Sequence, residues 1–213
     1  FIVPRPPALG GTRAEGSDPS TLDADQMTHI EHFLEIYAQL PRAGPGSYEC
    51  TKRAYKLMSD VPVAPRILDL GCGPGVQTAD LLKISGGTVL ALDLLPLMIE
   101  RTKANATRLG VSERLKVLQQ DMRELAFPDE SFDVIWSEGA IYNMGFEYGL
   151  EKVKPLVRSG GYVAVSEVVW LESDPPAPAA AFWQQYAGID TVENKLIVMD
   201  RLAYEHAGHF VLP

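Results

Sequence analysis

Five short apolar segments recur between residues 66 and 170, at intervals of about 20–30 residues. They read "RILDL", "TVLALDL", "RLKVLQQ", "FDVIW" and "GYVAVSEVVW", and segments of helix length lie between them, among them "VQTADLLKI", "PLMIERTKANATRLG" and "EYGLEKVKPLVRSG". Strands that are apolar almost throughout are typical of a parallel sheet whose two faces are both covered by helices. The pattern therefore predicts an α/β fold with a doubly wound, mostly parallel sheet.

The rest of the chain divides into regions around this sheet. The opening "FIVPRPPALGGTRAEGSDPS" is rich in Pro and Gly, so residues 1–20 are expected to form a flexible arm. Residues 21–60 are expected to form a helical cap, because "TLDADQMTHIEHFLEIYAQL" has helical apolar spacing and Ser47 can cap a second helix, "YECTKRAYKLM". Residues 61–213 then form the sheet domain. In it, a Pro/Ala-rich crossing after Trp170 leads into two helices, and "AGHFVLP" is expected to be a sixth strand.

The composition excludes several kinds of partner. The 19 Lys and Arg against 28 Asp and Glu give a net charge of −9 with the basic residues scattered, so we expect no nucleic-acid partner. No stretch approaches the ~20 apolar residues of a membrane helix and the opening lacks a signal-peptide core, so we expect a cytoplasmic protein without a membrane partner. Cys50 and Cys72 lack paired spacing, which favours a reducing compartment. No carboxylate pattern of a metal site accompanies the four histidines, so we expect no metal site.

A glycine-rich loop, "ILDLGCGPGVQTADLL", joins the first predicted strand to its helix. Gly71, Gly73 and Gly75 allow the backbone to approach a ligand closely, and the helix N-terminus presents free N–H groups. The nicotinamide-binding pattern needs a third glycine where Val76 stands, and no Gly-Lys-Ser/Thr of a nucleotide phosphate loop follows. Asp69, two residues before the first glycine, would repel a pyrophosphate but suits a ligand that carries an ammonium group.

The segment "LDLGCGPG" resembles the first motif of class I S-adenosylmethionine-dependent methyltransferases. The resemblance implies S-adenosyl-L-methionine as the cofactor and S-adenosyl-L-homocysteine as the product. It implies that Asp93, which closes the second strand, accepts from the two ribose hydroxyls. It also implies that Asp121, after the third strand, accepts from the adenine amino group while the Met122 N–H meets a ring nitrogen. The remaining cofactor contacts that we expect are those of Asp69, Gly71, Cys72, Gly73, Gln77 and Leu94.

Two further segments are similar to those of a subgroup of small-molecule methyltransferases. In that subgroup a stretch like "GPGS" lies over the cofactor, which implies that Ser47 is near its methionine carboxylate. A fourth-strand exit like "WSEGAIYNMGFEYGL" implies that backbone carbonyls around Ser137 receive the cofactor's amino group. The family's seven-stranded sheet ends in an antiparallel hairpin of which only "GHFVLP" is present here. We therefore expect the last strand to be absent, and the natural chain to continue past Pro213 or a partner to replace this end.

The exits of the fourth and fifth strands also carry polar side chains that suit an acceptor pocket. Glu138 and Tyr142 are expected to face the transferred methyl group. Glu138 would hold a cationic acceptor or take its proton, and Tyr142 would present its ring or its hydroxyl. Asn143, Glu167 and Trp170 are expected to line the same pocket as substrate-binding residues. Simpler roles stay open, because Glu138 could cap the next helix and the other side chains could serve packing alone.

The expected function is methyl transfer to a small-molecule acceptor. In-line displacement at a sulfonium carbon needs mainly positioning and desolvation, so no metal is expected. The chain lacks the Asn/Asp-Pro-Pro-Tyr signature of the family's amide-methylating branch, which disfavours a protein or RNA acceptor. The alternative of another class is a cofactor-binding regulatory protein without turnover, and Val76 disfavours a nicotinamide dehydrogenase. A homodimer is compatible with the sequence.

Overall fold

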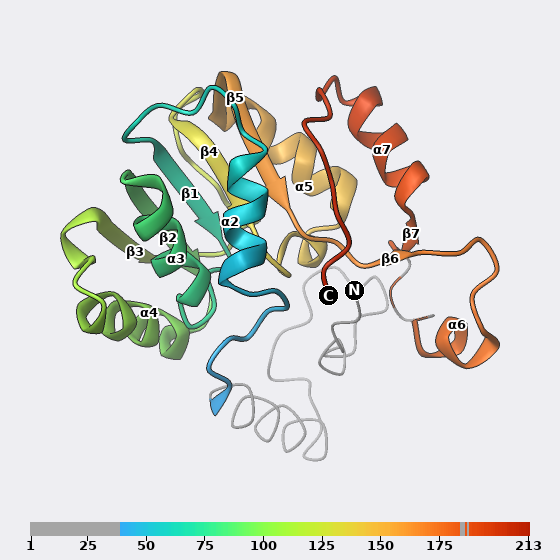
Figure 1. Cartoon of the computed structure of the whole chain (residues 1–213), viewed down its shortest axis with the longest axis horizontal. Helices are drawn as coiled ribbons and strands as arrows, with labels where there is room; N and C mark the ends of the chain where they lie inside the picture. Colours follow the sequence, from blue (N-terminus) through green and yellow to red (C-terminus); the bar gives the residue numbers. More distant parts are fainter. Residues whose placement is uncertain (1–38, 184–185, 187) are drawn as a thin grey trace.

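A parallel five-stranded sheet forms the centre of the fold (Figure 1). The computed structural model describes residues 39–213 except 184, 185 and 187. The strand order is β3-β2-β1-β4-β5, and every neighbouring pair is parallel. The doubly wound α/β fold predicted from the sequence is confirmed. The strands are β1 (Arg66–Leu70), β2 (Thr88–Asp93), β3 (Leu115–Gln119), β4 (Phe132–Ser137) and β5 (Val157–Val165).

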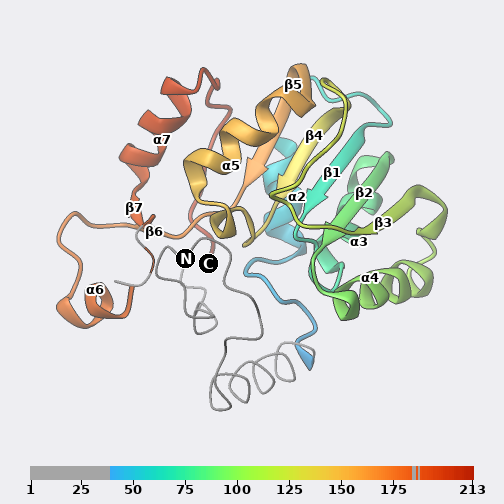
Figure 2. The same cartoon turned by 180° about the vertical axis from the view of Figure 1, so that it is seen from behind.

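Helices cover both faces of this sheet, which explains why its strands are apolar almost throughout. Neighbouring residues of a strand point to opposite faces, so Ile67 and Val134 belong to one core while Leu68 and Ile135 belong to the other. The first core is shared with α2, α3 and α4, whereas α5 covers the second (Figure 2). These helices are α2 (Tyr48–Lys56), α3 (Val76–Ser85), α4 (Pro96–Arg108) and α5 (Phe146–Val153).

The second helix of the predicted cap is α2, and it begins as expected. The Ser47 hydroxyl accepts a hydrogen bond from the Cys50 N–H at 3.3 Å, and Glu49 lies in the positive first turn. The predicted arm, residues 1–20, lies outside the described residues. So does the first cap helix, except for its last two residues.

The helix predicted over "EYGLEKVKPLVRSG" is shorter than expected. It is α5, which ends at Val153. Pro155 has no backbone N–H to continue an α-helix, so a 3-10 turn, η4 (Lys154–Leu156), follows and leads directly into β5. The predicted helix therefore contains the first residues of the fifth strand.

The fifth predicted strand, "GYVAVSEVVW", is split into two parts. β5 ends at Val165, and the next residue, Ser166, accepts a hydrogen bond from the Gly139 N–H at 2.7 Å through its hydroxyl. The remainder forms β6 (Val169–Trp170), which pairs with β7 (Asp190–Thr191) in a separate two-stranded sheet. The prediction of one long strand is wrong because the chain leaves the main sheet at Ser166.

The prediction of a sixth strand at "AGHFVLP" is also wrong. Residues 205–213 have no regular secondary structure and run beside α2 (Figure 1). There the Arg53 guanidinium lies over the Phe210 ring at 4.2 Å, and Gly208 lies against Leu57. A strand exists only through pairing with a neighbour, and no strand of the described ranges pairs with this segment.

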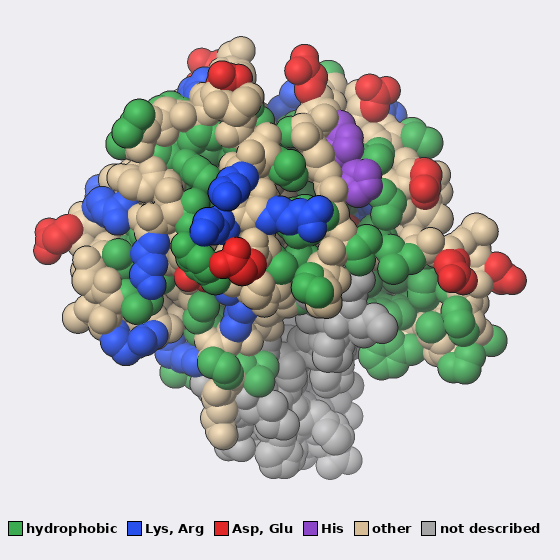
Figure 3. Space-filling view, viewed as in Figure 1, with side chains coloured by type: hydrophobic (Ala, Val, Ile, Leu, Met, Phe, Trp, Pro, Cys, Tyr) green, Lys and Arg blue, Asp and Glu red, His purple; other side chains and the backbone are tan. Residues whose placement is uncertain are grey.

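The two helices predicted after β6 are present as α6 (Ala177–Trp183) and α7 (Val192–Arg201). Val198 and Met199 of α7 pack on Leu150 of α5. Figure 3 shows apolar side chains gathered on α6, where Phe182 is half exposed. The same view shows Lys and Arg side chains spread over the face that α2 occupies, with apolar side chains between them.

The described residues contain neither a membrane-spanning helix nor a cluster of metal-binding side chains. No helix in residues 39–213, the three gaps left out, is long and apolar enough to cross a membrane. Within the same ranges no group of three His, Cys, Asp or Glu side chains could hold a metal ion. Cys50 and Cys72 are both buried free thiols.

Candidate active site

The glycine loop between β1 and α3 is held closely by its neighbours. The N–H groups of Gly71 and Cys72 both donate to the carbonyl of Leu92, at the end of β2, at 2.9 Å. From α4, Thr102 donates through its hydroxyl to the Gly73 carbonyl at 2.9 Å, and Asn105 donates to the carbonyl of Pro74 at 2.7 Å. Thr102 and Asn105 could not be identified from the sequence, because short polar residues on a helix give no signal without the fold.

The loop has no room for a side chain at its first glycine. A Cβ atom on Gly71 would lie 2.4 Å from the Ala140 Cβ and 3.0 Å from the Met122 Cε, and its φ of +68° disfavours any other residue. We predict that Gly71→Ala lowers the free energy of unfolding by roughly 2–4 kcal/mol, measured by urea denaturation.

Gly110 supplies the matched control for this substitution. Its φ is +69°, but a Cβ atom there would meet nothing within 4 Å. Gly110→Ala should therefore cost only the backbone strain, about 1 kcal/mol. Equal losses from the two substitutions would show that Gly71 is not confined by its neighbours.

Asp69 of β1 is fully buried beside this loop. Its Oδ2 accepts a hydrogen bond from the Thr78 hydroxyl at 2.6 Å, whereas its Oδ1 has no partner. Burial, as the largest cause, raises the pKa of Asp69 to about 7. An unpartnered buried carboxylate oxygen is costly, and a donor that reached it would be bound favourably.

Asp93 closes β2 and organises the loop from the neighbouring strand. One carboxylate oxygen accepts from the Gly73 N–H at 2.8 Å, and the other accepts from the Leu95 N–H at 3.0 Å. Burial raises the pKa of Asp93, and these backbone donors oppose that effect. Each oxygen keeps a second lone pair for a ligand hydroxyl. Leu94, beside it, is exposed at 55%.

Asp121 follows β3 and has a different environment. The Arg123 guanidinium holds both carboxylate oxygens, with Nε at 3.0 Å from each. This hydrogen bonding lowers the pKa of Asp121 below its ordinary value. A ligand at Asp121 would therefore share the carboxylate with Arg123 or displace it. Met122 packs in the core between the sheet and α5.

Three more predicted cofactor residues already bond to the protein through their side chains. Gln77 donates to the Cys72 carbonyl at 2.8 Å, and the Cys72 thiol lies 3.6 Å from the Thr102 hydroxyl. The Ser137 hydroxyl donates to the Leu70 carbonyl at 3.2 Å, while the Ser137 carbonyl accepts from the Ser166 N–H. These side chains therefore hold the loop and the exit of β4 in place and build the walls of the site.

Glu138, just past β4, accepts hydrogen bonds from three side chains. Its Oε2 accepts from Arg42 Nη2 at 2.8 Å, and its Oε1 accepts from the Thr51 hydroxyl at 2.8 Å and from Trp136 Nε1 at 2.9 Å. Glu138 does not cap a helix, because neither η3 (Ile141–Asn143) nor α5 has a side-chain cap. Arg42 and Thr51 belong to no motif, so their contacts with Glu138 could not be identified from the sequence.

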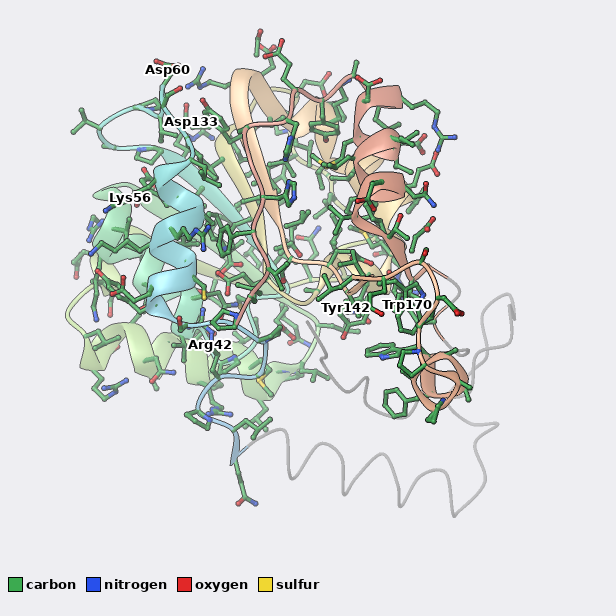
Figure 4. All side chains as sticks on the ribbon, turned by 45° about the vertical axis from the view of Figure 1, so that its right-hand side comes forward. Arg42, Lys56, Asp60, Asp133, Tyr142 and Trp170 are labelled. Atoms are coloured by element: carbon green, nitrogen blue, oxygen red, sulfur yellow. The ribbon has the colours of Figure 1, made fainter. Side chains whose placement is uncertain are left out.

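The acceptor-side residues predicted from the sequence lie around the following segment. Tyr142, in η3, meets the Tyr186 ring edge to face with ring centres 5.9 Å apart, and Figure 4 shows it on the same side of the molecule as Trp170. Asn143 donates to the carbonyl of Ala140 at 2.9 Å, so its amide is partly used within its own turn. Trp170 lies in β6, outside the main sheet.

Glu167 forms a buried ion pair that the sequence analysis did not predict. Its Oε1 accepts from Lys195 Nζ at 3.1 Å and from the Tyr186 hydroxyl, while its Oε2 is buried without a partner. Burial raises the pKa of Glu167, and the lysine opposes that effect. Lys195 also donates to the Gly188 carbonyl at 2.6 Å, so the pair ties Tyr186 and Gly188 to α7.

A cavity of about 250 Å³ lies beside these residues, between α2, β5, α7 and the C-terminal segment. Its walls are mostly apolar, with contributions from Ala54, Met58, Ala164 and Met199. Carboxylates also line it, those of Glu138 and Glu167. The site therefore combines a tight glycine loop, buried acids at the ends of neighbouring strands, and an adjoining apolar space.

Residues 67–161 match the family model of the methyltransferase domain. The match begins in β1 and ends in β5, so it contains the glycine loop and all three exit acids. This stretch is therefore similar to the methyltransferase domain, and the fold is that of a solved SAM-dependent methyltransferase.

Individual relatives agree with this class. A sterol 24-C-methyltransferase from Gibberella zeae is 28% identical over 126 residues, which are 58% of this chain and 33% of that protein. The 27-O-demethylrifamycin SV methyltransferase from Amycolatopsis mediterranei is 26% identical over 115 residues, 54% of this chain and 41% of that protein. A crystal structure of a SAM-dependent methyltransferase from Geobacter sulfurreducens, in complex with S-adenosyl-L-homocysteine, has a TM-score of 0.72 at 21% identity and covers 82% of this chain and 71% of that chain. The chain spans less than half the length of these two curated relatives.

Proposed function

We propose that this protein transfers a methyl group from S-adenosyl-L-methionine to a small-molecule acceptor. The observation that carries the proposal is the glycine loop held between Asp69 and Asp93 on adjacent strands. The methyltransferase-domain match over residues 67–161 supports it independently of that geometry.

The residues around the loop fit this cofactor. The unpartnered Asp69 Oδ1 suits a group that donates hydrogen bonds and carries positive charge, such as the cofactor's amino group. The free lone pairs of Asp93 suit two ribose hydroxyls. Gly71 lets Ala140 and Met122 pack directly against the loop, which fixes the shape of this part of the site. Asp121 and the Met122 N–H are proposed for the adenine, and Ser47 for the methionine carboxylate.

The cofactor, when bound, supplies a methyl group on a positively charged sulfur. An acceptor atom can attack that methyl carbon, and the sulfur then leaves. The chain contributes positioning and exclusion of water, since the loop, Ser137 and Glu138 are buried or nearly so. We propose Tyr142 and Glu138 as the residues beside the reacting atoms. Because three donors already hold Glu138, it orients its neighbours and adds negative charge near the methyl group more readily than it takes a proton.

The proposed acceptor is a small and largely apolar molecule. The cavity supports this, because its walls are mostly apolar and Glu138 lies in its lining. Relatives named for a sterol and for a rifamycin support the same class. Asn143, Glu167 and Trp170 are proposed to contact the acceptor.

The acidic net charge of −9 supports the absence of a nucleic-acid partner. The proposal also includes a cytoplasmic location, and it leaves a homodimer to be tested by light scattering.

Calorimetric titration with S-adenosyl-L-homocysteine and with NAD tests the cofactor. We expect saturable binding of the former in the micromolar range and none of the latter. A panel of apolar alcohols, phenols and amines with methyl-labelled cofactor then tests turnover. Binding of NAD alone would overturn the proposal. Binding of S-adenosyl-L-homocysteine without methyl transfer to any small molecule, protein or RNA would favour a regulatory protein instead.

A further inference from the structure

The segment Arg42–Ser47, here called the cover segment, lies against the glycine loop and the exit of β4. A Cβ atom on Gly73 would lie 3.4 Å from the Ala43 Cβ, so the two backbones approach closely. At the exit of β4, Cβ atoms on Gly44 and Gly139 would lie 3.2 Å from the Glu138 carbonyl oxygen and 3.0 Å from Pro45 respectively. The cover segment therefore closes one side of the proposed cofactor site.

Arg42 is the side chain that fastens the cover segment to the domain. Its guanidinium donates to Asp80 of α3 at 3.3 Å, to the Thr51 hydroxyl of α2 at 3.1 Å and to Glu138 at 2.8 Å. The Arg42 side chain is 14% exposed, and those of Asp80 and Glu138 are each 11% exposed. Water therefore screens this ion-pair network only weakly. Figure 4 shows Arg42 next to the start of α2.

We propose that Arg42, through Glu138, is the positioning residue that keeps the cover segment closed and thereby sets how long the cofactor stays bound. This inference rests on the proposed function. Without the guanidinium, Glu138 keeps only the neutral donors Thr51 and Trp136, and its charge is left poorly compensated near the buried Asp69. Moving Glu138 toward water relieves that cost, and the contacts of Gly44 and Pro45 with the β4 exit are lost with it.

The test replaces Arg42 by methionine, which keeps the length of the stem but removes the charge. We expect the dissociation constant of S-adenosyl-L-homocysteine to rise about tenfold, mainly through faster dissociation in stopped-flow measurements. We also expect faster hydrogen exchange in residues 43–51 of the ligand-free protein. Arg42→Lys keeps the charge but not the several donors of the guanidinium, so its values should lie between those of the wild type and of Arg42→Met. Lys103→Met, which removes an exposed ion pair with Glu100, should leave all three quantities unchanged.

A second variant opens the cover segment without touching the ion pairs. Gly44→Val adds bulk toward the Glu138 carbonyl, and it should raise the dissociation rate as Arg42→Met does. If both variants are folded and both dissociate at the wild-type rate, the inference is overturned although the proposed function stands. If the wild type does not bind S-adenosyl-L-homocysteine at all, the proposed function fails and the inference fails with it.

Discussion

Asp93→Ala should weaken binding of S-adenosyl-L-homocysteine by at least about 100-fold in calorimetric titration. The substitution removes the proposed acceptor for the ribose hydroxyls. It also frees the Gly73 and Leu95 N–H groups, which the carboxylate now holds at 2.8 and 3.0 Å. Both losses act on the same ligand, because Gly73 belongs to the loop that the cofactor is proposed to contact.

Asp133→Ala is the control for Asp93→Ala. Asp133 is also a partly buried strand aspartate that accepts from a backbone N–H, that of Arg66 at 2.7 Å, and from Arg158 Nε at 2.6 Å. It lies at the other end of the sheet, as Figure 4 shows by placing it beside Asp60 and far from Arg42. We expect a stability loss of about 1–3 kcal/mol but unchanged binding. Equal weakening of binding by both variants would contradict a specific role for Asp93.

The features predicted correctly are those that short stretches of sequence encode. The strands around Asp69 and Asp93 are apolar because both faces of the sheet are buried, and the glycines between them require close packing and positive φ. Each of these signals fits within ten or so residues, so the sheet and its loop could be predicted without knowledge of the rest of the fold.

The features that were missed depend on contacts between distant parts of the chain. Arg42 and Glu138 are 96 residues apart, and Lys195 and Glu167 are 28 apart. Neither pair gives a local pattern. The same holds for the predicted sixth strand, whose run of apolar residues packs beside α2 instead of pairing with another strand. Glu138 was identified from its position, but the three donors that hold it could be known only from the fold.

Asp69→Asn should change stability and cofactor binding in opposite directions. The pKa of Asp69 is about 7 in the folded protein, against an ordinary value of 3.8. Between these two values the folded state holds the proton more firmly than the unfolded state, so the free energy of unfolding falls as the pH rises through that window. At about pH 8 the buried carboxylate is charged and the penalty is fully present.

Asparagine removes that charge, so we expect the variant to be more stable than the wild type by roughly 1–3 kcal/mol at about pH 8. An amide N–H left without an acceptor offsets part of the gain. Urea denaturation across the pH range should show a flatter profile for the variant than for the wild type. A steeper profile, or an unchanged one, would contradict a raised pKa for Asp69.

Binding should show the opposite effect, because the ionised Asp69 attracts the cofactor's ammonium group. We expect the wild-type affinity for S-adenosyl-L-homocysteine to rise about tenfold between pH 6 and 8, with release of a proton on binding near pH 6.5. Asp69→Asn should bind more weakly at pH 8 and lose both the pH dependence and the proton release. Thr78→Val removes the hydrogen bond that lowers the pKa of Asp69, so it should move the midpoint of the binding profile to higher pH. If proton release persists in Asp69→Asn, the titrating group is not Asp69, and another carboxylate of the site attracts the cofactor's ammonium group.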